Sequence, residues 1–115
     1  GETENGAVVQ WTAMGEGSVD LKAYFKRFAE LCPGVPVHIE TISGARREFP
    51  YFKKEFWDVW PKARGKDFAK FVAQAKRGKP VAAGRAAGSE QEFQKNEVER
   101  SIKYCKEALG LGLQS

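Results

Sequence analysis

The sequence predicts an α/β fold in which one strand lies between amphipathic helices, and three observations predict it. Apolar residues recur with helical spacing in several stretches, and one β-branched run separates two of these stretches. The chain also has enough apolar material to form a core, since 42% of its 115 residues are hydrophobic and 12% are aromatic. Because only one segment has strong strand character, we expect the isolated chain to be mostly helical.

The helices are predicted from apolar stripes and from the residues that bound them. Asp20 is a suitable N-cap for a helix that ends at Pro33-Gly34, and its apolar face comprises Leu21, Tyr24, Phe25, Phe28 and Leu31. A short helix is expected at 55–60 and a longer one at 65–76. The last helix spans 90–109 and is followed by a C-cap glycine, while residues 81–89 form an Ala/Gly-rich linker.

Residues 35–42 are the strongest candidate strand. The segment is rich in β-branched residues, and alternation puts Val37, Ile39 and Thr41 on one face and His38 and Glu40 on the other. The opening stretch, 6–14, is less regular and is expected to be a short extended segment or a loop. A single strand leaves its own backbone groups without partners. We therefore expect this strand either to pair with another chain or to belong to a larger sheet.

The order of helix, strand and helix is that of a βα unit from a parallel sheet. A complete eight-stranded (β/α) barrel needs about 250 residues, so we expect this chain to be the C-terminal part of a longer protein. In that interpretation residues 1–115 form one partial domain. Residues 1–44 end the barrel, with 35–42 as the final strand; 45–80 form an aromatic and basic loop with helices; 81–89 are the linker; and 90–110 are the C-terminal helix.

The positive charge is concentrated in the middle of the chain. Residues 44–80 contain eleven basic and four acidic side chains, net +7, whereas residues 1–43 carry net −3. Such a segment could attract a phosphate, a nucleic acid or an acidic surface. Because acidic residues are interspersed among the basic ones, an ordinary solvated helix face explains the same pattern.

The composition excludes several other classes of protein. Cys32 and Cys105 are too few for a disulfide framework and do not form a Cys-x-x-Cys motif, so both are expected to act as small buried hydrophobic residues. No window has the roughly 20 consecutive apolar residues of a membrane span, and residues 1–6 lack the features of a secretory signal. We expect a cytoplasmic protein without a membrane partner.

An ordered set of motifs resembles the C-terminal part of the sugar phosphate isomerases/epimerases of the xylose isomerase-like TIM-barrel superfamily. The resemblance covers nearly the whole chain, and four motifs carry it: Gln10-Trp11-Thr12-Ala13-Met14-Gly15-Glu16-Gly17-Ser18-Val19-Asp20, Val35-Pro36-Val37-His38-Ile39-Glu40, Arg47-Glu48-Phe49-Pro50-Tyr51, and Glu99-Arg100-Ser101-Ile102-Lys103-Tyr104-Cys105. In that superfamily a Gly-Glu-Gly sequence follows the seventh strand and a glutamate ends the eighth, where Glu40 lies here.

The resemblance implies a metal-dependent isomerisation or epimerisation of a sugar or sugar phosphate. A divalent metal such as Mn²⁺, Mg²⁺, Co²⁺ or Zn²⁺ polarises the substrate, and a carboxylate transfers a proton. Glu40 is the implied metal ligand and general base. Trp11, His38, Arg46 and Arg47 are candidate substrate-binding residues. The other ligands of the family would precede this chain, so the metal is expected only with ligands from outside it, and the chain alone is expected to be inactive.

Each of these residues also has an ordinary structural explanation. Glu40 could pair with Arg46 or Arg47, the two arginines could form a surface pair, His38 could be a packed or hydrogen-bonded residue, and Trp11 could belong to a core. Glu16 is expected to be a solvated turn residue. Two other functions stay open: a phosphoesterase similar to apurinic/apyrimidinic endonucleases, and a non-enzymatic helical module that binds an acidic partner. Nucleic acid is not the expected partner, and an unpaired sheet edge predicts self-association.

Overall fold

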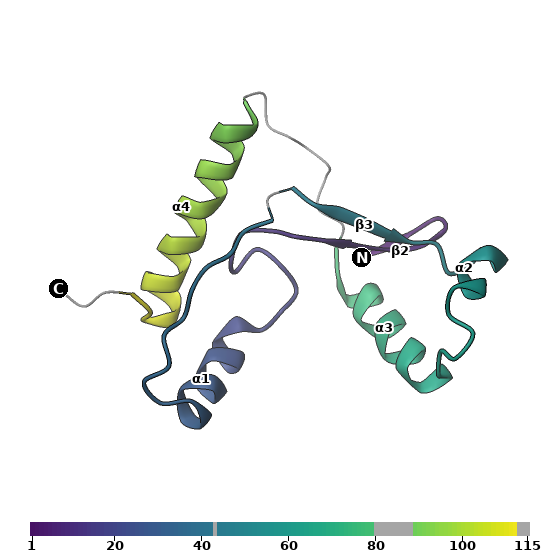
Figure 1. Cartoon of the computed structure of the whole chain (residues 1–115), viewed down its shortest axis with the longest axis horizontal. Helices are drawn as coiled ribbons and strands as arrows, with labels where there is room; N and C mark the ends of the chain where they lie inside the picture. The colour runs from purple at the N-terminus through teal and green to yellow at the C-terminus, as the bar shows by residue number, and fades with distance from the viewer. Residues whose placement is uncertain (43, 80–88, 113–115) are drawn as a thin grey trace. The chain divides into compact units, whose positions relative to one another are not determined.

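A computed structural model describes residues 1–42, 44–79 and 89–112 of the chain (Figure 1). Those residues form an α/β structure with a small antiparallel sheet and four helices, in the order β1 (Glu2–Thr3), β2 (Gly6–Gln10), α1 (Leu21–Leu31), β3 (Arg46–Phe49), α2 (Lys54–Asp58), α3 (Gly65–Arg77) and α4 (Glu90–Leu109). The chain divides into two compact units. Unit 1 contains residues 1–10 and 45–83, and unit 2 contains residues 11–44 and 84–115.

Unit 1 is built on a three-stranded sheet with the order β1-β2-β3. β1 and β2 form a hairpin in which Thr3 lies opposite Gly6, and β3 returns antiparallel to β2 with Gln10 opposite Arg46. The pairing satisfies backbone groups of these strands within the chain. β2 and β3 thus pair although they lie about 40 residues apart in the sequence.

The core of unit 1 is aromatic. Ala7, Tyr51 and Ala75 are buried, and partly buried side chains from α2 and α3 pack against them: Phe56, Trp57, Phe68, Phe71 and Val72. The indole Nε1 of Trp57 donates a hydrogen bond to the carbonyl oxygen of Tyr51 at 2.9 Å, and its ring meets that of Phe68 edge to face. These contacts hold the short helix α2 against the rest of the unit.

Unit 2 consists of α1, α4 and the segments between them. Asp20 caps α1 by accepting a hydrogen bond from the Ala23 backbone, as predicted. α4 begins with a capping box between Ser89 and Glu92 and ends at Gly110 in the left-handed conformation, which is the predicted C-cap. α1 packs against α4.

Two strand predictions are wrong. Residues 35–42 contain no strand, because in the described part of the chain the Val35 amide makes their only backbone hydrogen bond, to the carbonyl of Cys32. The strand propensity of this segment is thus present without a partner strand. Conversely, the sequence predicts a loop at Arg46–Phe49, but this segment is strand β3, because its backbone pairs with β2.

The helix predictions are confirmed to within a few residues. The predicted helix between the Asp20 cap and Pro33-Gly34 is α1, and the predicted segments 55–60, 65–76 and 90–109 correspond to α2, α3 and α4. Apart from Ser89, the predicted linker 81–89 lies outside the described residues. None of the helices in the described part of the chain combines the length and the apolar character that crossing a membrane requires. The sheet is antiparallel throughout, so it does not confirm the parallel barrel that the sequence suggests.

Candidate functional site

Glu40 and His38 lie in unit 2, on the segment that precedes β3 in the chain. Both side chains are exposed, and neither makes an ion pair or hydrogen bond with a described residue. The Glu40 carboxylate and the His38 imidazole are therefore exposed to solvent, and their oxygen and nitrogen atoms are available to bind a ligand.

Trp11 follows strand β2 in the chain, and the two arginines lie on strand β3. Trp11 directly follows β2 and is 41% exposed, so it is not a core residue. Arg46 and Arg47 lie on β3 in unit 1 and are exposed. Arg46 donates to the Glu48 carboxylate at 2.9 Å, on its own strand. Arg47 makes no ion pair with a described residue and so is the freer of the two to bind an anion.

The Gly-Glu-Gly turn has a structural role that the sequence did not reveal. Gly15 has φ +86°, and the ring of Tyr104 on α4 occupies the space where a side chain on Gly15 would lie. Glu16 receives two hydrogen bonds from Arg100, from Nε at 2.6 Å and from Nη2 at 3.4 Å. The Glu16 hydrogen bond raises the pKa of Arg100 above its ordinary value, and burial partly opposes that shift. Glu16 is exposed in this turn, as predicted, and its carboxylate in addition pairs with Arg100 on α4.

A buried stripe lies on the same helix; burial of Cys105 was predicted, whereas burial of the polar residues Glu97 and Ser101 was missed. Glu97, Ser101 and Cys105 follow each other at intervals of four residues and are 3%, 0% and 5% exposed. The Met14 amide donates to the Ser101 hydroxyl at 3.0 Å. The Oε2 atom of Glu97 has no hydrogen-bond partner among the described residues. Only the four-residue spacing of polar groups within the apolar face of α4 could have indicated this stripe.

The donors present do not by themselves fit a divalent metal. Glu40 and His38 offer the right atoms, a carboxylate oxygen and an imidazole nitrogen, but a divalent ion in a protein needs several convergent ligands. Among residues 1–42, 44–79 and 89–112, no three His, Cys, Asp or Glu side chains come together. A metal site that includes Glu40 would need further ligands.

Comparisons with known proteins do not assign a family. No protein-family model, no curated protein and no solved structure matches this chain.

Proposed function

We propose that this chain is the C-terminal segment of a sugar or sugar-phosphate isomerase/epimerase built on a (β/α)8 barrel. Its part in the reaction is to supply Glu40 for proton transfer at the carbon next to the substrate carbonyl. A divalent metal would assist by polarising that carbonyl, with its remaining ligands from outside the described residues. The ordered motifs that resemble this superfamily are the sequence support for the proposal.

The observation that carries the proposal is the unpaired segment 35–42. Its apolar side chains remain exposed: Val35 and Ile42 are each 53% exposed, and Val37 and Ile39 are each 38% exposed. Burying apolar surface contributes roughly 2.5 kcal/mol per 100 Å². In a barrel, neighbouring strands would pair with the backbone N–H and C=O groups of this segment, and the packed elements around it would cover its apolar side chains. Glu40 would then lie near the carboxyl end of a strand, where barrel enzymes have their reacting groups.

The test is proton exchange in the complete protein that carries this chain. Incubation of a panel of aldose and ketose phosphates in D₂O, followed by NMR, detects deuterium that is incorporated next to the carbonyl. We expect incorporation with Mn²⁺ and its loss with EDTA. Glu40→Gln should lower the rate at least 100-fold, within the range typical of removing a general base.

Glu107→Gln is the matched control, because Glu107 is an exposed glutamate of unit 2 with no ion pair to a described residue. It should leave the rate unchanged. Equal rates for Glu40→Gln and the unmodified protein would refute the role of Glu40. Exchange activity in the 115-residue chain alone would refute the proposal that its catalytic residues lie partly elsewhere.

A further inference from the structure

A second surface surrounds the short helix α2 in unit 1, outside the unit 2 segment that carries Glu40. It combines three large exposed apolar residues with three lysines, and we refer to it as the α2 surface: Phe52, Lys53, Lys54, Val59, Trp60 and Lys62. α2 has only five residues, so at a rise of about 1.5 Å per residue its two ends are about 7 Å apart. The six residues lie on α2 or within four residues of its ends, so they are exposed close to one another around this short helix.

The apolar side chains of this surface are exposed although α2 itself is well anchored. Phe56 and Trp57 face the core of the unit, where Phe56 packs on Phe49. Phe52, Val59 and Trp60 are nevertheless 70%, 74% and 53% exposed. The turn that carries Trp60 is fixed, since its amide donates to the Trp57 carbonyl and its carbonyl accepts from Ala63, each at 3.0 Å. Large apolar residues held outward in this way are typical of binding surfaces.

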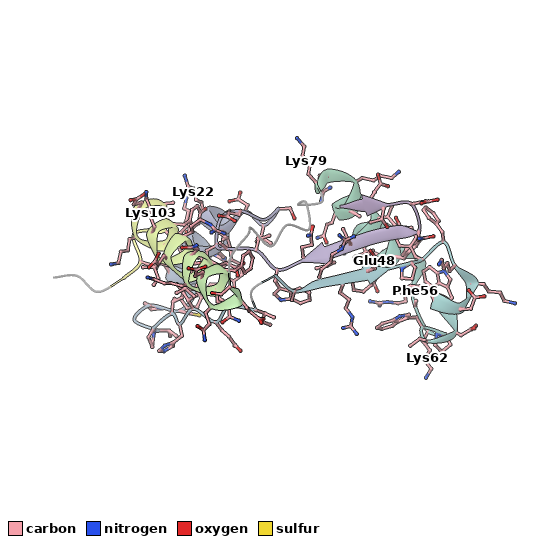
Figure 2. All side chains as sticks on the ribbon, turned by 90° about the horizontal axis from the view of Figure 1, so that it is seen from above. Lys22, Glu48, Phe56, Lys62, Lys79 and Lys103 are labelled. Carbon is pink, nitrogen blue, oxygen red and sulfur yellow. The ribbon has the colours of Figure 1, made fainter. Side chains whose placement is uncertain are left out.

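The charge around these residues indicates an acidic partner. Unit 1 has eleven basic and six acidic side chains. Lys53, Lys54 and Lys62 make no ion pair with a described residue, and Figure 2 shows the Lys62 side chain projecting outward from the ribbon. Exposed lysines next to exposed apolar side chains match the composition of a protein interface, which has an apolar centre and a polar rim.

A peptide explains the composition better than a nucleic acid does. Glu55 and Asp58 lie on α2 among the lysines and would repel a continuous phosphate backbone, whereas a peptide can place its apolar residues opposite them. Two of the arginines in the unit are engaged within it, Arg46 with Glu48 and Arg64 with Asp67.

We infer that the α2 surface binds an acidic peptide segment that also carries apolar side chains, which contact Phe52, Val59 and Trp60. The carboxylates of that segment lie against Lys53, Lys54 and Lys62. This binding function uses none of the residues assigned to isomerisation, so it stands or fails independently of the proposed enzyme activity.

The test is fluorescence anisotropy with the 115-residue chain and a fluorescein-labelled peptide made of three repeats of Glu-Leu-Glu-Glu-Phe. We expect a Kd below about 100 μM that weakens as salt is added. Trp60→Ala should weaken binding at least tenfold, the effect of losing an anchor residue. Lys54→Glu with Lys62→Glu should abolish most of the salt dependence. Lys103→Glu, an exposed lysine on α4 in unit 2, is the matched control and should leave the Kd unchanged.

Three results would overturn the inference. An all-glutamate peptide of the same length that binds equally well would show that the apolar residues are not used. A 15-nucleotide oligothymidine that binds more tightly than the peptide would assign the surface to nucleic acid. Absence of binding up to 100 μM peptide, with the circular dichroism spectrum of the chain intact, would exclude an acidic peptide ligand of this kind.

Discussion

Replacing Gly15 by alanine should destabilise unit 2 more than any other glycine substitution considered, and the structure supplies its own control. Gly15 has φ +86° and Gly34 has φ +76°, so both require the left-handed conformation. That conformation costs a non-glycine residue about 1–2 kcal/mol. The two positions differ in their surroundings, because nothing lies within 4 Å of a Cβ built on Gly34.

At Gly15 the added methyl group would collide with the Tyr104 ring. Three ring atoms would lie closer than 3.0 Å to the new Cβ, nearer than real Cβ contacts permit. Moving a packed ring out of the way costs about 1–3 kcal/mol, as other overpacking substitutions do. We therefore expect Gly34→Ala to lower the free energy of unfolding by about 1–2 kcal/mol and Gly15→Ala to lower it by about 2–5 kcal/mol.

Urea unfolding followed by circular dichroism at 222 nm measures both values, since α1 and α4 contribute 11 and 20 helical residues to unit 2. Tyr104→Ala provides the decisive background. Without the ring, the additional effect of Gly15→Ala should fall to that of Gly34→Ala. If the two glycine variants lose equal stability in the unmodified background, the turn at Gly15 does not pack against α4 and the account of this motif is wrong.

Three further predictions concern α4. Ser89→Ala removes the side-chain half of the capping box and should lower the free energy of unfolding by about 1 kcal/mol, measured by urea titration. Burial raises the pKa of the Cys105 thiol above its ordinary value of 9.0, so the stability that depends on the neutral thiol is present below pH 9 and is lost as the pH rises further. Unfolding midpoints at pH 8 and pH 10 should therefore differ more in the unmodified chain than in Cys105→Ala. Glu97 is buried and its Oε2 atom has no hydrogen-bond partner among the described residues, so Glu97→Met should change the free energy of unfolding by less than about 1 kcal/mol in thermal melts. A loss above about 2 kcal/mol would show that a partner stabilises the carboxylate.

Helices were predictable from the sequence because their determinants are local. The stripe from Leu21 to Leu31, the Asp20 cap and the Gly110 C-cap all lie within one or two turns of the residues that they organise. Strands were not predictable in the same way, since β3 depends on β2, from which it is separated by about 35 residues of intervening chain. Arg46-Arg47-Glu48 has little strand propensity of its own, while the strongly β-branched segment 35–42 has the propensity but no partner among the described residues.

The same distinction separates the parts of the candidate site. Glu40 and His38 are proposed from the sequence, because ionisable groups interrupt an apolar alternation and because Glu40 matches the strand-end glutamate of the superfamily that the chain resembles. The Arg100–Glu16 pair and the Ser101 contact to Met14 were not found, since each joins positions more than 80 residues apart. Spacing within a segment carries no information about such long-range pairs.

The role found for the Gly-Glu-Gly turn changes how the resemblance should be weighed. Gly15 is required by its backbone conformation and by Tyr104, and Glu16 is engaged by Arg100, so packing alone explains both residues. They therefore carry no separate evidence for a sugar site. Glu40 differs, because no contact with a described residue explains an exposed carboxylate on an apolar, unpaired segment. The proposed function therefore depends on Glu40, and Glu40→Gln is the substitution that tests it.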